Sequence, residues 1–366
     1  MSDDIKEIFM RLAIEEAKKG LGRTSPNPAV GAIVLRDGEI LGRGYHHKYG
    51  ESHAEVNAIN DAKKRTNDLT GCEIYVTLAP CNHHGKTPPC TKAIMESGIK
   101  TVYIGSSDPN NRADTAEGIL NMRKQGITVH TGVAEAECDE LLRFFRKYTT
   151  TRLPYLSAKV AMSLDGYIAA KDGSSRWITN DKARSFGHHL RDIHDGILVG
   201  ASTVLHDNPE LTCRIPGGRN PKKVLVLGAR EIPLEAKVFS NDPPIIVITD
   251  ASHSKTAIEG YISKNAIIID APNVVFSDVL KQLGSEHNIR SILVEGGSRI
   301  ISNLTGASLI DRFYIFYAPV LLGSTENKYK PFDLLNIPNI KQAKRLQFKE
   351  TSRFDDDILA IYDIVR

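Results

Sequence analysis

The sequence predicts an α/β protein of two domains. Its 366 residues exceed what one hydrophobic core usually serves. Apolar segments with helical spacing alternate with short β-branched segments along both halves, a pattern typical of sheets covered by helices. The sequence Thr-Thr-Thr-Arg-Leu-Pro at 149–154 interrupts this alternation. We therefore predict one domain at residues 1–148 and a second at 149–366.

The N-terminal half begins with a helix and a hairpin. Ile5, Ile8 and Phe9 recur at helical spacing, and Ser2 is a candidate N-cap. Asp37-Gly38 between two strand-like runs is a strong hairpin signal. The elements expected next are strands at 30–36 and 39–45, a helix at 53–65, a strand at 73–78, a helix at 90–97, a strand at 101–104, a helix at 117–124, a strand at 127–131 and a helix at 134–147. A hairpin followed by this alternation predicts a three-layer α/β/α domain.

The C-terminal half has the pattern of a second α/β domain. Strands are expected at 155–162, 196–199, 223–227, 245–249, 266–269, 291–294 and 312–319. Helices are expected between them, at 181–191 and 278–283.

Composition and charge exclude several function classes. The formal net charge of +3 is too small to indicate nucleic-acid or membrane binding. The chain has no run of about 18 apolar residues, and its acidic start lacks the basic region of a signal peptide. The five cysteines are too few, and odd in number, for a disulfide framework. We expect a cytoplasmic protein with reduced thiols that are available to a metal.

Four residues in the N-terminal half form a pattern typical of a catalytic zinc site. His53 and Glu55 form a His-x-Glu sequence, Cys81 follows a proline, and Cys90 comes nine positions later. An imidazole and two thiolates fill three tetrahedral positions on zinc, and water takes the fourth with its pKa lowered toward about 7. A carboxylate that is not a ligand can carry protons from this water to a leaving amine. This signature belongs to zinc nucleobase deaminases, so we predict one zinc ion per chain and a catalytic Glu55.

This interpretation depends on where the helices begin. Residues two apart on a helix do not share a face, so His53 and Glu55 converge only in a first turn. Gly50 and Ser52 favour a helix start there. A lone His-x-Glu or a lone cysteine pair is more often structural, whereas the combination in this order indicates zinc.

The segment between the two cysteines carries a family resemblance. Residues 81–90 read Cys-Asn-His-His-Gly-Lys-Thr-Pro-Pro-Cys, whereas cytidine and tRNA adenosine deaminases have two residues between these cysteines. The segment closely resembles the bifunctional deaminase/reductase of riboflavin biosynthesis, the RibD/RibG family. Further matches follow in the same order at 27–31, 108–110, 161–166, 177–179, 203–205, 207–209, 211–212 and 294–297. The resemblance implies a cytidine-deaminase-like domain followed by a dihydrofolate-reductase-like domain.

The resemblance also implies two successive reactions. The first is zinc-dependent hydrolytic removal of the 2-amino group of 2,5-diamino-6-ribosylamino-4(3H)-pyrimidinone 5′-phosphate. The second uses NADPH to reduce the ribosyl group of 5-amino-6-(5-phosphoribosylamino)uracil to ribityl. The implied zinc ligands are His53, Cys81 and Cys90. The implied deaminase substrate residues are Asn27, His46, His83, Lys86, Asp108 and Asn110.

The residues of the reductase half carry a weaker signal by themselves. A Gly-x-Gly-x-x-Gly sequence after a strand is absent. The turn at 295–298 follows a predicted strand, and its glycines would let backbone N–H groups approach a phosphate, although a plain strand-to-helix turn is the commoner case. The resemblance implies NADPH contacts at Ala161, Trp177, Thr203, Asp207, Gly228, Gly297, Ser298, Arg299, Ile300, Ile301, Ser302 and Asn303. It implies reductase substrate contacts at Ser175, Arg191, Leu211, Arg214 and Glu295. The guanidinium forks of Arg191 and Arg214 suit a sugar phosphate.

The chain departs from the family pattern at three places. Ala79 stands where the family usually has glutamate, which removes a carboxylate near the metal without removing a ligand. The segment at 111–118, interpreted as a loop beside the substrate, lacks the Pro-x-Val-x-Gly that normally follows Asp108-Pro109-Asn110. Gly228 lies where an aspartate-containing pair is common.

Two alternatives remain open from the sequence. One is a zinc deaminase of another pyrimidine or purine with a silent second domain, and the other is a catalytically silent zinc-bound scaffold. The ten-residue cysteine segment argues against the first, and the intact zinc signature against the second. We expect a small-molecule substrate and a homo-oligomer, dimer or tetramer, while the sequence does not specify NADPH over NADH.

Overall fold

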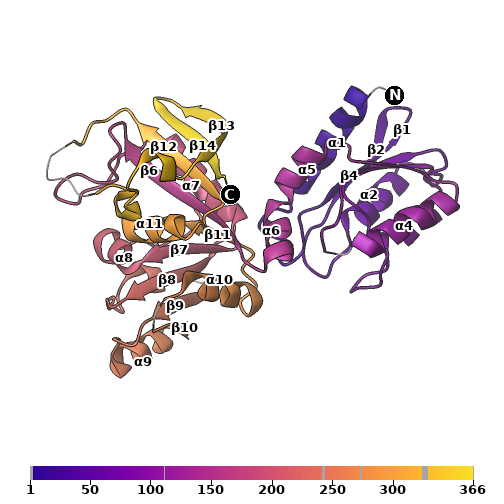
Figure 1. The fold of residues 1–366 in the computed structure, drawn as a ribbon. Coiled ribbons are helices and arrows are strands. Elements are labelled where there is room, and N and C mark those ends of the chain that lie inside the picture. The colour runs from indigo at the N-terminus through magenta and orange to yellow at the C-terminus, as the bar shows by residue number, and fades with distance from the viewer. Residues whose placement is uncertain (1–2, 111, 241–243, 273, 324–328, 366) are drawn as a thin grey trace. The chain divides into compact units, whose positions relative to one another are not determined.

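The computed structural model describes residues 3–110, 112–240, 244–272, 274–323 and 329–365. It divides into two compact units, Met1–Arg152 and Leu153–Arg366 (Figure 1). The division follows helix α6 (Arg143–Thr151), which continues through the predicted break at Thr149. The hydroxyl of Thr151 donates to the carbonyl of Lys147 one turn earlier, at 2.7 Å, which lets threonine remain helical. Pro154 disfavours helical backbone at the residue before it, so the chain leaves the helix here.

Unit 1 contains a five-stranded sheet among its described residues, in the order β2-β1-β3-β4-β5. The strands are β1 (Gly31–Arg36), β2 (Glu39–Tyr45), β3 (Glu73–Leu78), β4 (Thr101–Ser106) and β5 (Thr128–Thr131). β1 is antiparallel to β2 and β3, while β3, β4 and β5 are parallel. Asp37 and Gly38 between β1 and β2 both have positive φ, 52° and 83°, as a type I′ hairpin turn requires.

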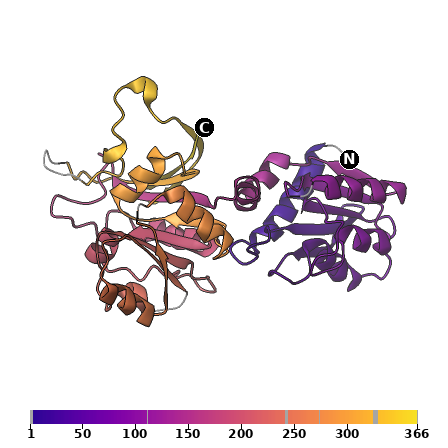
Figure 2. The same ribbon diagram turned by 60° about the horizontal axis from the view of Figure 1, so that its bottom comes forward.

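Helices cover both faces of this sheet (Figures 1 and 2). They are α1 (Asp3–Lys18), α2 (Ala54–Lys63), α3 (Cys90–Ser97), α4 (Arg112–Lys124), α5 (Glu135–Leu141) and α6. Successive strand residues point to opposite faces. Tyr75 therefore packs with Met10 of α1, and Val76 packs with Ile59 of α2 and Ile94 of α3. The predicted three-layer α/β/α architecture is confirmed.

Small residues bring α2 close to β2. A Cβ atom at Gly44 of β2 would lie 2.3 Å from the Ala58 nitrogen and 2.5 Å from the Ala54 oxygen. Only glycine fits this approach without a shift of the backbone. The contact fixes the first turn of α2, which carries Glu55 and follows His53.

Two details of unit 1 differ from the expectations. The helix expected at 134–147 is two helices, α5 and α6, because Leu142 between them has non-helical backbone angles (φ −89°, ψ 5°). The segment interpreted as a loop at 111–118 is helical from Arg112 onward. Asn111 and the candidate N-cap Ser2 lie outside the described residues.

Unit 2 contains a nine-stranded sheet among its described residues, in the order β10-β9-β8-β7-β11-β6-β12-β14-β13. The strands are β6 (Tyr155–Ser163), β7 (Gly196–Gly200), β8 (Lys222–Gly228), β9 (Ile245–Thr249), β10 (Ala266–Asp270), β11 (Ser291–Val294), β12 (Arg312–Ala318), β13 (Leu346–Phe354) and β14 (Asp357–Ile364). From β10 to β12 the strands are parallel, and β14 and β13 join them in antiparallel fashion. The last strand, β14, therefore lies inside the sheet and β13 lies at its edge.

The helices of unit 2 lie on both faces of this sheet (Figures 1 and 2). They are α7 (Asp181–Ile193), α8 (Ala201–Asp207), α9 (Lys255–Ser263), α10 (Phe276–Ser285) and α11 (Ser298–Gly306). Leu198 of β7 packs toward α10 and α11, while Val199 packs toward α8 and α9. The second α/β domain is confirmed, although α8, α9, β13 and β14 had not been predicted. None of the described helices is both long and apolar enough to cross a membrane.

Candidate active sites

The ends of three elements carry the predicted zinc ligands. His53 is the extended residue immediately before α2 (φ −74°, ψ 166°), and Glu55 lies in the first turn of that helix. This is the arrangement in which two residues in a His-x-Glu sequence can converge. Cys81 follows the end of β3, and Cys90 is the first residue of α3. Because each of these elements packs against the core, the backbone position of each ligand residue is fixed.

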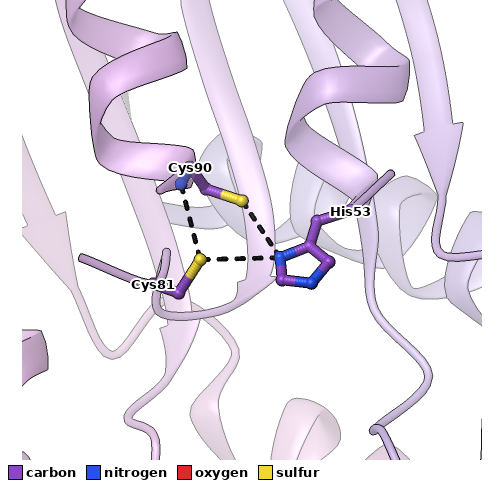
Figure 3. Close-up of side chains that lie close together, drawn as sticks. All are labelled: His53, Cys81 and Cys90. Atoms are coloured by element: carbon purple, nitrogen blue, oxygen red, sulfur yellow. Dashed lines mark hydrogen bonds between the residues drawn. The ribbon is translucent and has the colours of Figure 1, made fainter. Parts of the chain in front are cut away.

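The ligand atoms of His53, Cys81 and Cys90 lie close together (Figure 3). His53 Nδ1 is 3.2 Å from Cys90 Sγ and 3.5 Å from Cys81 Sγ, and all three atoms lie within 4.8 Å of one another. Tetrahedral zinc, with bonds of about 2.0 Å to nitrogen and 2.3 Å to sulfur, would hold these atom types about 3.5 Å apart. The spacing fits such an ion, and three protein ligands leave one position for water.

The charges of the two cysteines are coupled. Hydrogen bonds from the thiol and backbone N–H of Cys90, assisted by His53, lower the pKa of the Cys81 thiol to about 4. The neighbouring Cys81 and burial raise the pKa of the Cys90 thiol. Two adjacent thiolates repel each other, so ionising both requires a cation. The donor set therefore suits a divalent metal ion.

Glu55 lies beside these ligands and is almost fully buried, with 3% of its surface exposed. Burial, and then the negative charge of Cys81, raise its pKa to about 7, against the opposing effect of His53. A carboxyl group with such a pKa can both accept and release a proton near neutral pH.

Two of the zinc ligands, His53 and Cys81, line a cavity of about 460 Å³. The lining includes His53, Glu55 and Cys81, together with all six residues predicted for the deaminase substrate: Asn27, His46, His83, Lys86, Asp108 and Asn110. The cavity has the size of a small-molecule site. The fold thus brings together in one cavity side chains that are spread over residues 27–110 of the sequence.

Asn27 and His46 form a hydrogen-bonded pair in this wall. The Asn27 side-chain nitrogen lies 3.1 Å from His46 Nε2, and His46 Nδ1 lies 3.1 Å from the carbonyl oxygen of Ser52. A carbonyl only accepts, so Nδ1 carries the proton and Nε2 accepts from the amide. His46 is 2% exposed, and burial lowers its pKa. The pair therefore presents a neutral, oriented polar surface.

Tyr49 and Phe145 also line the cavity, and sequence reasoning had missed both. The ammonium group of Lys86 lies 4.1 Å from the centroid of the Tyr49 ring, which is cation–π geometry. Tyr49 lies four residues before His53, a position that could have drawn attention to it. Phe145 belongs to α6 and has no signal in the sequence.

Ala79 lies in the same wall and is 6% exposed. Its backbone N–H donates to the carbonyl of Ser106 at 2.9 Å, which joins the end of β3 to β4. Alanine has no carboxylate at this position, unlike the glutamate that is usual in the family. The three metal ligands nevertheless keep a spacing that fits zinc.

Arg191 and Glu295 form a bidentate ion pair in unit 2. Arg191 Nε and Nη2 each donate to one oxygen of Glu295 at 2.7 Å, and Nη1 donates to the carbonyl of Thr212 at 2.8 Å. Burial would raise the pKa of Glu295, but the charge and hydrogen bonds of Arg191, with Lys159, lower it to about 2. The fork of Arg191 therefore faces Glu295 in this structure, and its contact with a sugar phosphate stays a prediction.

A second group of predicted residues meets near the glycine turn after β11. Gly296 contacts α8, since a Cβ atom there would lie 2.7 Å from Thr203 Oγ1. Gly297, immediately before α11, has a φ of 68°, which glycine adopts readily. At the end of α8, Asp207 accepts a hydrogen bond from the Ser175 hydroxyl at 3.4 Å. The structure thus links the turn, α8 and the Ser175 segment.

The remaining predicted residues of unit 2 vary in exposure. Trp177 is 68% exposed, with the Arg184 guanidinium 4.3 Å from its ring centroid. Leu211 is buried at a φ of 58°, and Gly228 has a φ of 57°. Ala161 is half-buried and Arg214 is exposed. On α11, Ile300 and Ile301 pack in the core, and the Ser302 hydroxyl donates to the carbonyl of Pro331. The other predicted residues on α11 are Ser298, Arg299 and Asn303.

Family models match both units. A model described as the cytidine and deoxycytidylate deaminase zinc-binding region matches residues 3–106. A model described as the RibD C-terminal domain matches residues 154–360. The two matches correspond to the unit with the His-Cys-Cys cluster and to the unit with the nine-stranded sheet.

Full-length relatives match the whole chain. The riboflavin biosynthesis protein RibD of Actinobacillus pleuropneumoniae is 38% identical, with 98% of this chain and 95% of the relative covered. That of Aquifex aeolicus is 37% identical, with 99% of each covered. The solved deaminase/reductase of Thermotoga maritima is 38% identical with a TM-score of 0.86, and 99% of each chain is covered. Acinetobacter baumannii RibD is 30% identical with a TM-score of 0.87 over 100% of both chains. The chain therefore belongs to the RibD family of bifunctional riboflavin biosynthesis proteins.

Proposed function

We propose that this chain deaminates 2,5-diamino-6-ribosylamino-4(3H)-pyrimidinone 5′-phosphate and then reduces 5-amino-6-(5-phosphoribosylamino)uracil to its ribityl form. The solved relative of Thermotoga maritima is described as a diaminohydroxyphosphoribosylaminopyrimidine deaminase/5-amino-6-(5-phosphoribosylamino)uracil reductase. One observation carries the proposal for the deaminase. Two of the three zinc ligands, His53 and Cys81, line a single cavity together with the buried Glu55 and the six predicted substrate residues.

In the deaminase unit, His53, Cys81 and Cys90 hold the zinc ion. Zinc, when bound, supplies an activated water at neutral pH. Glu55 moves a proton toward the leaving amine, which its buried position beside the ligands favours. Asn27, His46, Asp108 and Asn110 orient the pyrimidine by hydrogen bonds, and His83 and Lys86 bind the phosphorylated ribosyl part.

In the reductase unit, the turn at Gly297 and the start of α11 hold the cofactor phosphates. NADPH, when bound, supplies the hydride. Glu295 contacts the substrate, and Arg191 keeps its carboxylate ionised and fixed. The exposed Arg214 meets the sugar phosphate, since a guanidinium fork matches phosphate oxygens. The further cofactor contacts are Ala161, Trp177, Thr203, Asp207 and Gly228, with Ser175 and Leu211 at the substrate.

We make three further proposals about the chain as a whole. The N-terminal unit carries the deaminase and the C-terminal unit the reductase. The five free cysteines, two of them zinc ligands, suit a reducing compartment. The enzyme acts as a homo-oligomer on a small molecule, without nucleic acid.

Mass analysis of products tests both activities. The diaminopyrimidine substrate is incubated with the purified zinc-loaded enzyme, with and without NADPH. We expect the deaminated product without NADPH and a further gain of two hydrogens with it. A product that stops at the deaminated stage would contradict the reductase proposal, and an unchanged substrate would contradict the deaminase proposal.

A further inference from the structure

The first turn of α4 carries a carboxylate directed at the cysteine segment. Asp114 Oδ2 accepts a hydrogen bond from the backbone N–H of Asn82 at 3.1 Å and another from His83 Nδ1 at 2.9 Å. The Asp114 side chain is 15% exposed, whereas that of His83 is 52% exposed. One shielded oxygen therefore holds both the main chain after Cys81 and the ring that extends from it.

Close packing keeps α4 against this segment. A Cβ atom at Gly118, one turn after Asp114, would lie 3.0 Å from both Asn82 Cβ and Thr91 Cγ2. The Thr91 hydroxyl donates to the Asn82 side-chain oxygen at 3.0 Å, which joins the segment to α3. Asn82 thus lies between two helices, and the position of Asp114 relative to it is fixed on both sides.

The chemistry of the contact determines which edge of the His83 ring remains for a ligand. A carboxylate only accepts hydrogen bonds, so Nδ1 must carry the proton in this contact. Nε2 lies on the other edge of the ring, and His83 lines the cavity. A carboxylate behind a histidine that fixes its tautomer and orientation is a common way to prepare the ring for binding.

We propose that Asp114 is a positioning residue for the deaminase substrate, acting through His83. The proposal rests on the proposed function, which assigns His83 to substrate binding. Asp114 is not itself a zinc ligand, and its loss should weaken substrate binding more than it slows the chemical step.

Steady-state deamination by three variants tests this role. Asp114→Ala removes both contacts, and Asp114→Asn keeps an oxygen acceptor for the Asn82 N–H while removing the charge. Glu117→Gln changes an exposed acid on the same helix and serves as the control. We expect Asp114→Ala to raise KM about tenfold with kcat changed less than about twofold, Asp114→Asn to lie between, and the control to match the wild type. An unchanged KM, or a lower kcat with loss of zinc, would overturn the proposal.

A double-mutant cycle separates positioning from a general structural effect. If Asp114 acts through His83, the pair Asp114→Ala and His83→Ala should raise KM no more than His83→Ala alone. Multiplying effects would overturn the proposal.

The tautomer of His83, measured from its ring ¹⁵N shifts, tests the contact without any substrate. We expect protonated Nδ1 in the wild type and a shift toward protonated Nε2 in Asp114→Ala. A wild-type ring protonated at Nε2 alone would overturn the proposal. An enzyme with the expected tautomer but no deamination would instead refute the proposed function.

Discussion

Glu55 and His53 are two residues apart, and their different surroundings give them different roles. The His53 ring extends from the residue before α2 toward two sulfur atoms at 3.2 and 3.5 Å, so it is a ligand. Glu55 enters the helix and becomes buried, and its pKa rises to about 7. A helix start is the place where both side chains can point toward the same site, His53 as a metal ligand and Glu55 as a proton carrier.

The first prediction concerns Glu55→Gln. Glutamine keeps the shape and polarity of the side chain but cannot take up the proton, so deamination should fall by about 10²- to 10⁴-fold. Zinc content should remain at about one ion per chain. Ammonia release and metal analysis measure the two effects. Glu117→Gln, which alters an exposed carboxylate outside the cavity lining, is the control. Ammonia release at the wild-type rate in Glu55→Gln would refute the role of Glu55.

The second prediction concerns pH and the Arg191–Glu295 pair. The pKa of Glu295 is lowered from its ordinary value of 4.5 to about 2, so the pair stabilises the folded state fully above pH 4.5. This contribution is lost as the pH falls toward 2. The difference in unfolding free energy between the wild type and Glu295→Gln should therefore shrink between pH 6 and pH 3, by an amount on the order of 2 kcal/mol. Denaturant unfolding at both pH values measures it, and a constant difference would contradict the assigned pKa.

The metal site could be predicted from the sequence because histidine and cysteine are typical zinc ligands, so their identity and spacing are informative by themselves. His53, Cys81 and Cys90 were predicted to meet, and their ligand atoms lie within 4.8 Å of one another. Asp114 and Phe145 were missed because an isolated acid or aromatic residue has no pattern. Their significance comes from tertiary contacts with segments far along the chain.

At the scale of elements, packing of small residues decides where α2 begins relative to the sheet. Strand β2 presents Gly44 to α2, and no larger residue fits there without moving the helix. The core strands were predictable because an alternation of apolar residues indicates both that a segment is a strand and which of its faces is buried. β13 was not, since its residues are nearly all exposed and carry no apolar alternation.

The third prediction is that Gly44→Ala destabilises unit 1 and disturbs zinc binding. The added methyl group would lie within 2.5 Å of α2 backbone atoms, so the helix must shift, at a cost of about 3 kcal/mol. Thermal unfolding and zinc affinity measure the effect. Gly187→Ala in α7 has no atom within 4 Å of the added carbon and should be neutral or stabilising. Equal stability of Gly44→Ala and the wild type would show that α2 does not depend on this contact.

At the scale of the whole molecule, the two units have separate cores. Clusters around Val76 and Tyr75 stabilise unit 1, and clusters around Leu198, Val199 and Leu293 stabilise unit 2. The zinc ligands all belong to unit 1, while the Arg191–Glu295 pair belongs to unit 2. Metal binding should therefore stabilise one unit and leave the other unchanged.

The fourth prediction is that calorimetry of the full chain shows two transitions, one of which responds to a zinc chelator. Removing an ion that binds only the folded state lowers the stability of the unit that holds it. The other transition should shift with NADPH instead. Equal shifts of both transitions with the chelator would show that the units unfold as one.

The place of β14 bears on the order in which the molecule is made. β14 pairs with both β12 and β13, so the sheet of unit 2 cannot be completed until nearly all of the residues of this unit have been synthesised. Unit 1 ends at Arg152 and has its own hydrophobic core. At about 5–20 residues per second, the 214 residues of unit 2 take roughly 10–40 s to make. During that interval a folded deaminase unit can already bind zinc, while the sheet of the reductase unit is still incomplete.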